Sequence, residues 1–477
     1  MENELIQIGP SPPPQDLKRY VVENGQAPTS AANSQEAQGK TFYIETFGCQ
    51  MNVHDSEKVA GALQAQGYRA VESHEEADLI LYNTCSIREK AAQKVFSRLG
   101  AFKKSAGGSS KLIGVLGCVA QQEGERIFER APQVSLVCGS ASYSKIGELI
   151  DQLESGNRRV TGLSLQTDEC FETELTRRDH PFRAYLTIIE GCDKACSYCV
   201  VPMTRGPERS RPSDRILEDA RRLAGDGYSE IQLLGQTVNS YRDPSSARLS
   251  FTELLVRVAE IKGIRRVRFT TSHPRDFTAE IVLAIESCPA LCDHIHLPVQ
   301  CGSNAVLSRM KRTYTREEYL EKIVCIRSSK RAISISTDII VGFCGETEND
   351  FEETMDLLER VEYDQVFSFK YSVRPNTAAG QWPDGVPEEE KGRRLTILQD
   401  RQREIQLRRN RALVGGEFEV LVEGFHPKLG QSVGRTTSNR VINFPGELDW
   451  AGQYLNVRVT AAGPNSLVGE RMLQPSG

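Results

Sequence analysis

The chain has 477 residues, of which 39% are hydrophobic and 26% are charged, so it is long enough for about three globular domains. No apolar run approaches the ~18 residues of a membrane span, and the first residues lack a basic segment followed by an apolar one. We therefore predict a cytoplasmic protein without membrane contact, whose 13 cysteines stay reduced and act as ligands, catalysts or core residues. The net charge of −5 excludes a general basic coat for nucleic acid, so any RNA binding must use local patches.

The N-terminal part changes character at residue 41. Residues 1–40 are rich in Pro, Gln, Ala and Ser and are predicted to form a disordered tail. After them, short apolar runs such as TFYIETFGC, ADLILYNTC and KLIGVLGC are each followed by a helix-like stretch. This alternation predicts a parallel α/β domain at 41–165.

Two further domains follow. The central block has six strand-like runs, RAYLTIIEGC, EIQLLGQ, RVRFTTS, HIHLPVQ, ISISTDIIVGF and QVFSFKYS. Six β-α units are fewer than the eight of a complete barrel, so we predict a partial (β/α)6 barrel at 182–405 whose open side admits a bulky substrate. After a charged helix at 386–411, alternating residues with Gly-containing turns predict a small antiparallel β-barrel at 408–475. The predicted fold class is α/β with this barrel appended.

The stretch EGCDKACSYCVVPMTRG at 190–206 carries Cys192, Cys196 and Cys199 directly after a predicted strand. Barrel enzymes build their active sites on loops at this end of a strand. Soft thiolates suit either zinc or an iron–sulfur cluster. Structural zinc takes four protein ligands, and the next cysteine is Cys288. A [4Fe–4S] cluster on three cysteines would leave one iron open for a substrate or cofactor; at this point both metals remain possible.

A second set of three cysteines is scattered through the N-terminal domain. Cys49, Cys85 and Cys118 each stand at the end of a predicted strand. Thiols at equivalent ends of parallel strands can converge on a crevice beyond the carboxyl edge, although free cysteine is also often a core residue. We interpret the three as ligands of a second cluster with its own open iron, and Cys138 as a packing residue.

With both sets in place, the chain resembles the radical S-adenosylmethionine (SAM) methylthiotransferases from about residue 41 to its end. GCQMNVHDSE, NTCSIREKA, IIEGCDKACSYCVVPMTRG, LLGQTVNSY, RFTTSHPRDF, HLPVQCGSN and STDIIVGFCGETE are similar to motifs of the branch that acts on dimethylallyladenosine in tRNA. The resemblance implies that Cys49, Cys85 and Cys118 hold an auxiliary [4Fe–4S] cluster. It also implies that Cys192, Cys196 and Cys199 hold the SAM cluster, with Tyr198 as the typical aromatic, and that the terminal barrel is an RNA-binding TRAM domain.

The activity implied by this resemblance is addition of a methylthio group to C2 of N6-dimethylallyladenosine next to the anticodon. It proceeds by SAM-dependent sulfur methylation and radical C–H activation. The implied partners are the tRNA anticodon loop and a one-electron donor such as flavodoxin or ferredoxin, and we expect a monomer. Three alternatives stay open: action on threonylcarbamoyl-adenosine in tRNA, action on a ribosomal protein, and a non-catalytic, zinc-stabilised RNA-binding protein.

Supporting residues are predicted more loosely. Side chains at the ends of central strands could line the SAM site or be ordinary loop residues: Gln236, Asn239 and Ser272. Gly342 could let the backbone approach SAM or only shape a turn, and Glu346 could contact SAM or cap the next helix. For RNA, phosphate contacts or merely solvated faces are predicted at Arg205, Arg209, Arg211, Arg265, Arg266, Arg268 and the basic helix 391–411.

Overall fold

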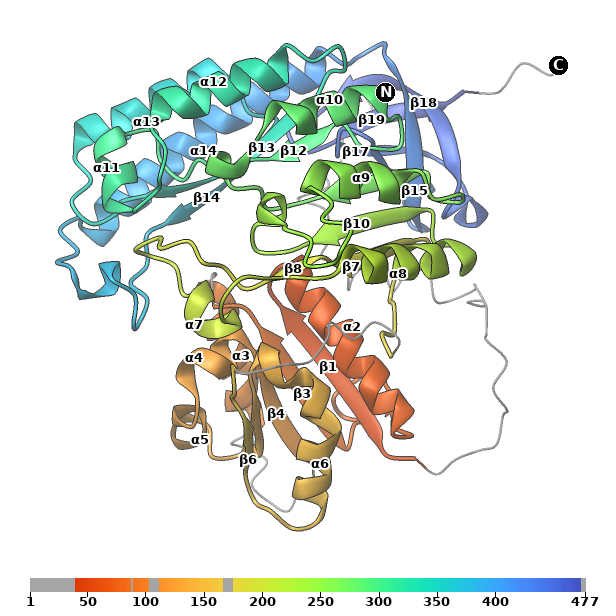
Figure 1. Cartoon of the computed structure of the whole chain (residues 1–477), viewed down its shortest axis with the longest axis vertical. Coiled ribbons are helices and arrows are strands. Elements are labelled where there is room, and N and C mark those ends of the chain that lie inside the picture. The colour runs from red at the N-terminus through yellow and green to blue at the C-terminus, as the bar shows by residue number, and fades with distance from the viewer. Residues whose placement is uncertain (1–38, 87–88, 103–110, 166–174, 473–477) are drawn as a thin grey trace.

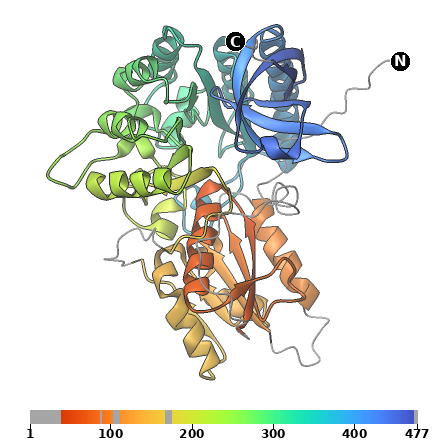
Figure 2. The ribbon, with the colours of Figure 1, turned by 90° about the vertical axis from the view of Figure 1, so that its right-hand side faces the viewer.

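A computed structural model describes residues 39–86, 89–102, 111–165 and 175–472 of the chain. The predicted tail, 1–40, lies almost wholly outside these ranges. Figures 1 and 2 place the N-terminal part at one end of the molecule and the central and C-terminal parts together at the other. No helix of the described ranges is both long and apolar enough to cross a bilayer.

The N-terminal part is a six-stranded parallel sheet in the order β2-β1-β3-β4-β5-β6. Its apolar strands are buried on both faces, as parallel strands covered by helices must be. The sequence predicted the four inner strands and missed β2 and β6, because edge strands of two or three residues carry no periodic signal. The elements are β1 (Thr41–Phe47), α2 (Gln50–Ala65), β2 (Arg69–Ala70), β3 (Leu79–Thr84), α3 (Glu89–Phe102), β4 (Leu112–Gly117), α4 (Cys118–Glu123), α5 (Arg126–Arg130), β5 (Leu136–Cys138), η2 (Ser140–Lys145), α6 (Ile146–Glu154) and β6 (Val160–Gly162).

The central part is an open half-barrel of six parallel strands in chain order. Sheets β7-β10-β11 and β12-β13-β14 meet at a bridge between Val267 and Leu291, and helices cover the outside (Figure 1). The (β/α)6 prediction is therefore confirmed. Its elements are β7 (Arg183–Thr187), β8 (Ile189–Glu190), α7 (Val201–Arg205), β9 (Arg209–Ser210), α8 (Ser213–Gly225), β10 (Glu230–Leu234), η3 (Val238–Ser240), α9 (Phe251–Ala259), β11 (Arg266–Phe269), η4 (Pro274–Asp276), α10 (Ala279–Ser287), β12 (His294–His296), α11 (Asn304–Arg309), α12 (Arg316–Arg327), β13 (Ser334–Val341), α13 (Glu348–Val361), β14 (Gln365–Lys370), η5 (Ala379–Gln381) and α14 (Glu388–Arg411).

The C-terminal part is a closed five-stranded barrel in the order β15-β16-β17-β19-β18. The sequence predicted four of these strands, and β19 closes the cylinder. The predicted division at 405–408 falls inside the continuous helix α14, so that boundary remains a proposal. The elements are β15 (Glu417–His426), β16 (Gln431–Thr436), β17 (Val441–Pro445), η6 (Leu448–Trp450), β18 (Tyr454–Ala462) and β19 (Leu467–Arg471).

The small barrel packs against the amino ends of the central strands. Arg183, the first residue of β7, pairs with Glu423 of β15 at 3.0 Å. Ser334, the first residue of β13, donates to the Ser438 carbonyl at 2.7 Å. The barrel therefore closes the end of the half-barrel opposite the carboxyl ends of its strands, where loops build active sites.

Candidate active site at the seam of the N-terminal and central parts

Three cysteines lie side by side at the carboxyl edge of the N-terminal sheet. Strands β1, β3 and β4 are neighbours, and their last residues Phe47, Thr84 and Gly117 stand in register. Cys85 and Cys118 follow directly after β3 and β4, and Cys49 follows β1 by two residues at the N-cap of α2. The parallel register thus brings together the three thiols that the sequence predicted to converge.

The backbone around this triad leaves no room for larger residues. Gly117 has φ of +90°, and a Cβ there would lie 2.6 Å from the Thr84 carbonyl oxygen. A Cβ on Gly48 would lie 2.8 Å from Cβ of Cys85. Each glycine stands immediately before a cysteine of the triad, so the close approach of the loops depends on both.

A buried hydrogen-bond network of two asparagine side chains lies against the triad. Asn83 donates through Nδ2 to the Asn52 carbonyl at 2.8 Å and to the Ser56 hydroxyl at 2.9 Å. Asn52 donates in turn to Asn83 Oδ1 at 3.2 Å, and its own Oδ1 lies 3.3 Å from the Cys49 sulfur. Neither asparagine is recognisable as a site residue from the sequence, because a lone Asn inside a strand or helix carries no chemical signal of its own.

Cys138 differs from the triad in both position and surroundings. It pairs in register with Leu116 inside the sheet and belongs to the apolar core beneath α6. Burial raises the pKa of its thiol to about 12. This placement agrees with the packing role predicted for it.

The second triad lies on the loop between β8 and α7. Each of its thiols receives one N–H donor at 3.4 Å: the Lys194 amide for Cys192, the Arg312 guanidinium for Cys196 and the Val201 amide for Cys199. Such donors stabilise thiolates and tune the potential of a bound cluster. Nothing in the sequence marked Arg312, which is more than a hundred residues from the loop.

The two triads differ in electrostatic state. The pKa of Cys49 is lowered to about 6, first by its hydrogen bond with Cys85 and, in addition, by the positive charge of Arg205. The pKa of Cys199 is raised to about 12 by burial and by the neighbouring Cys196. A cation beside Cys49 and N–H donors on the loop are the features that stabilise thiolate ligands.

Arg205 joins the two triads across the seam. It ends α7, six residues after Cys199, and forms a buried ion pair with Asp55 of α2. The side chains of Arg205 and Asp55 are 6% and 2% exposed. Its positive charge acts on Cys118 as well as on Cys49.

An apolar contact continues the seam into the mouth of the half-barrel. Met51 of α2 packs against Tyr185 of β7 and Leu234 of β10. Beside it, Thr270 at the end of β11 donates to Gln50 at 3.3 Å. The start of α2, and with it Cys49, therefore covers part of the mouth.

The thiols of the described ranges are not grouped as a single metal ion would require. In the described ranges, no three His, Cys, Asp or Glu side chains are grouped closely enough to share one metal ion. A structural zinc would need such a group, because each Zn–S bond is only ~2.3 Å long. A [4Fe–4S] cluster is a larger body that holds its thiolates farther apart. The zinc interpretation therefore finds no support in this arrangement.

Two of the residues predicted to line the SAM site have unsatisfied polar atoms. Gln236 Oε1 and Ser272 Oγ are buried and have no hydrogen-bond partner within the described part of the chain. Buried polar atoms without partners are rare, so these fit a site that receives a polar ligand. Asn239 instead exchanges two hydrogen bonds with the His273 backbone, at 2.7 and 2.9 Å. Tyr198 packs edge-on against Phe343 at 6.2 Å.

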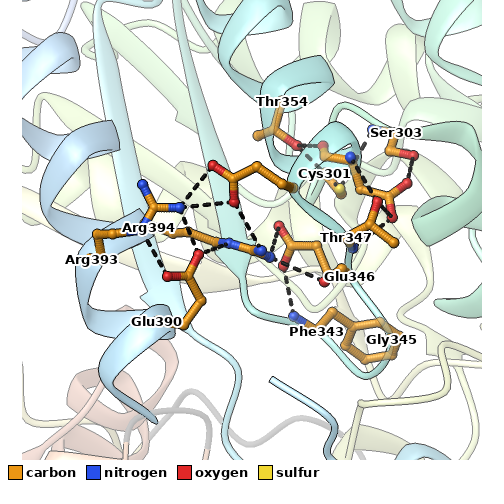
Figure 3. Close-up of polar contacts among 12 residues, drawn as sticks. Cys301, Ser303, Phe343, Gly345, Glu346, Thr347, Thr354, Glu390, Arg393 and Arg394 are labelled. Atoms are coloured by element: carbon orange, nitrogen blue, oxygen red, sulfur yellow. Dashed lines mark hydrogen bonds and ion pairs between the residues drawn. The ribbon is translucent and has the colours of Figure 1, made fainter. Parts of the chain in front are cut away.

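Gly342 and Glu346 serve the loop after β13. Gly342 has φ of +71°, and a Cβ there would lie 2.3 Å from Lys391, so the glycine admits this lysine of α14. Glu346 accepts from the Phe343 amide at 2.9 Å and lies 3.7 Å from Arg394 (Figure 3). Burial raises its pKa to about 7. The cap of α13 is Thr347, so the capping role considered for Glu346 is wrong.

The arginines predicted to contact RNA are engaged within the protein. Arg268 pairs with Glu230 at 3.1 Å, Arg265 with Glu419 at 2.8 Å and Arg209 with Glu190 at 3.4 Å. Four of the arginines predicted to contact RNA are buried: Arg205, Arg211, Arg266 and Arg268. Cations of α14 likewise pair with acids of α13 and of α14 itself: Arg393 and Arg394 with Glu348 and Glu390, and Arg401 with Glu359 and Glu404. These ion pairs tie the named arginines into the fold, and contact of this helix with phosphate stays a prediction.

Three family models match successive parts of the chain. An uncharacterized protein family, UPF0004, matches residues 41–139, the radical SAM superfamily matches 186–358, and the TRAM domain matches 411–471. The first match contains the Cys49, Cys85 and Cys118 triad, and the second contains the cysteine loop.

Relatives match nearly the whole chain. A tRNA-2-methylthio-N(6)-dimethylallyladenosine synthase of Solibacter usitatus is 64% identical over 436 residues, covering 91% of this chain and 98% of the relative. A synthase of the same name from Aquifex aeolicus is 44% identical, covering 90% and 98%. Among solved structures, a radical S-adenosylmethionine methyltransferase from Kitasatospora setae superposes with a TM-score of 0.52 at 13% identity, covering 72% of this chain and 77% of the other. That last likeness concerns the fold alone.

Proposed function

We propose, because this chain belongs to the tRNA-2-methylthio-N(6)-dimethylallyladenosine synthase family, that it adds a methylthio group to C2 of N6-dimethylallyladenosine beside the anticodon of tRNA. The observation that carries the proposal is the pairing of two cysteine triads across one buried seam. A radical SAM enzyme needs only the loop triad. The second triad, in register on three neighbouring strands, supports transfer of a sulfur-containing group.

We assign each triad to one [4Fe–4S] cluster. Cys192, Cys196 and Cys199 would hold the cluster that binds SAM, and the Cys49, Cys85 and Cys118 triad would hold the auxiliary cluster. When bound, SAM and the clusters supply one-electron C–H activation and the methylated sulfur. The assignment is supported by the N–H donor on each loop thiol, and by the glycines that directly precede Cys49 and Cys118 at the sheet edge.

The chain's own residues fix the relative position of the two triads and exclude water from the site. The Asp55–Arg205 pair fixes α7 against α2, and so fixes one triad relative to the other. The Met51 contact with Tyr185 and Leu234 seals that side of the mouth against solvent. Gln236 and Ser272 offer unsatisfied oxygens for the polar groups of SAM, since buried polar atoms favour ligands that satisfy them.

The partners follow from this chemistry. The substrate is tRNA, whose target adenosine must leave the stack of the anticodon loop to reach the seam. We further propose an external one-electron donor of the flavodoxin or ferredoxin class, a monomeric enzyme and a cytoplasmic location, where the thiols stay reduced.

Anaerobic reconstitution tests the proposal. Two clusters predict about eight irons per chain with matching acid-labile sulfide. With SAM, a reductant and tRNA carrying dimethylallyladenosine, mass spectrometry should find a methylthio group on that nucleoside. Modification only of tRNA carrying threonylcarbamoyl-adenosine, or only of a ribosomal protein, would replace the substrate. One zinc per triad without sulfide would overturn the enzyme itself.

A further inference from the structure

Strands β12, β13 and β14 turn a polar wall toward the inside of the half-barrel. In β13, Ile335, Ile339 and Val341 are buried in the core beneath the helices. Ser336 and Asp338 alternate with them and therefore point to the other face, the lumen. The register places Asp338 beside Phe367 of β14, which is the edge strand.

Phe367 is an exposed aromatic on this wall. It is 37% exposed, and its partner across the sheet is Asp338. Its ring meets that of His296 at 5.8 Å in an edge-to-face contact, which fixes its orientation. A large exposed aromatic held in one orientation beside a carboxylate is a stacking platform for a planar ligand.

A chain of hydrogen bonds orients the polar groups beside it. The Ser336 hydroxyl lies 2.9 Å from His294 Nε2 and 2.9 Å from His296 Nδ1. Burial lowers the pKa of His294 to about 3, so its ring is neutral and can donate to Ser336, which then donates to His296. This order leaves the Nε2–H of His296 facing Asp338, 3.5 Å away.

The Asp338 carboxylate can accept further hydrogen bonds from a ligand. Its side chain is 30% exposed, and within the described ranges the one ring nitrogen recorded beside its carboxylate is His296 Nε2, 3.5 Å away. A carboxylate has about four acceptor positions, so most remain free for a ligand with an N–H group. The wall therefore combines a flat apolar face with a directed anionic acceptor.

The opposite side of the mouth carries the auxiliary triad. Thr270 continues the lumen face of β11, and it bonds to Gln50, the residue after Cys49. A planar ligand on the β13–β14 wall thus lies across the lumen from the start of α2. We infer that this wall binds the target nucleobase, with Phe367 stacked on the adenine ring and Asp338 accepting the N6–H of the modified amine.

This inference rests on the proposed function and adds a specificity. N6-dimethylallyladenosine carries an N6–H and an uncharged, apolar substituent, which Asp338 and Phe367 accommodate. A threonylcarbamoyl substituent carries a carboxylate, which Asp338 repels. The wall therefore selects the dimethylallyl nucleoside by attraction and excludes the threonylcarbamoyl one by charge.

Binding of anticodon stem-loop RNA to the reconstituted full chain tests the wall. Fluorescence anisotropy would compare loops that carry dimethylallyladenosine, threonylcarbamoyl-adenosine or adenosine. We expect Phe367→Ala to weaken binding of the dimethylallyl loop about 10- to 100-fold, and Phe367→Tyr to restore it. Asp338→Asn should weaken that loop about tenfold and strengthen the threonylcarbamoyl loop. Controls on outer helices are Val324→Ala and Glu218→Gln, which should leave both affinities unchanged.

The outcomes separate this inference from the proposed function. If the wild-type chain shows no preference for the dimethylallyl loop, the proposed function fails. If the wild type has that preference and Phe367→Ala and Asp338→Asn both keep it, only the assignment of the wall as the nucleobase site fails. A loss of SAM affinity at unchanged RNA affinity would also overturn the inference, because the wall would then belong to SAM. Thermal unfolding of Phe367→Ala and Phe367→Tyr checks that both variants are folded.

Discussion

The buried pair between Arg205 and Asp55 allows a quantitative test of the seam. Arg205→Gln leaves the Asp55 carboxylate, 1% exposed as a residue, without its cation. Removing one partner of a buried ion pair costs about 3–5 kcal/mol. Because the pair joins α7 to α2, this loss should appear as easier local opening of both helices rather than as unfolding of the central core.

Hydrogen–deuterium exchange of the metal-free full chain measures that opening. A loss of 3–5 kcal/mol corresponds to exchange about 150- to 4000-fold faster in peptides from α2 and α7. Asp55→Asn should produce a similar change, and the double variant should cost less than the sum of the two because neither charge is left alone. Arg215→Gln is the matched control: Arg215 and Glu218 form an exposed pair at 3.3 Å, worth less than about 1 kcal/mol.

Two results would refute this reasoning. Exchange in Arg205→Gln that matches Arg215→Gln would mean that the pair does not hold the seam. Additive losses in the double variant would mean that Arg205 and Asp55 act separately. In the reconstituted enzyme, Arg205→Gln should also form less methylthiolated RNA per SAM cleaved. The three thiols of the loop triad are unchanged in this variant, whereas the distance between the two triads is no longer fixed.

Further variants probe the triad edge and the buried carboxyl group. Gly117→Ala should displace Cys118 and lower the iron content from about eight to about four per chain. Gly67→Ala is the control, because Gly67 has a similar φ but open space around it, and this variant should keep its iron. Equal iron content in the two variants would contradict the steric argument. Cys138→Ala should keep about eight irons and lose about 1 kcal/mol of stability, and halved iron would make it a ligand. Burial raises the pKa of Glu346 from 4.5 to about 7, so the stability contributed by its protonated carboxyl group is present below pH 4.5 and is lost as the pH rises through 7. Glu346→Gln should therefore stabilise the protein by up to about 3 kcal/mol at pH 8, seen as a higher melting temperature, but should not do so at pH 4. Equal shifts of the melting temperature at both pH values would contradict a buried charge at Glu346.

The sequence predicted the cysteines better than their surroundings. Cys49, Cys85 and Cys118 could be placed together because each follows an apolar run, and parallel strands end at a common edge. Short strands such as β2, and β19 near the chain end, were missed because their signal is weak. Asn52 and Arg312 escaped notice because a single polar residue acquires meaning only when the fold brings it to a thiol.

Charge was the least reliable guide, and the strands explain why. Arg266 and Arg268 alternate along β11 and so face the lumen, where the terminal barrel satisfies them with the carbonyls of Arg435 and Thr436. Thr270 continues the same face at the other end of the strand and reaches α2. Polar residues at the amino ends of these strands therefore dock the terminal barrel, while those at the carboxyl ends stay available for ligands. Position along a strand, which composition cannot reveal, decides whether its polar face holds the fold or the substrate.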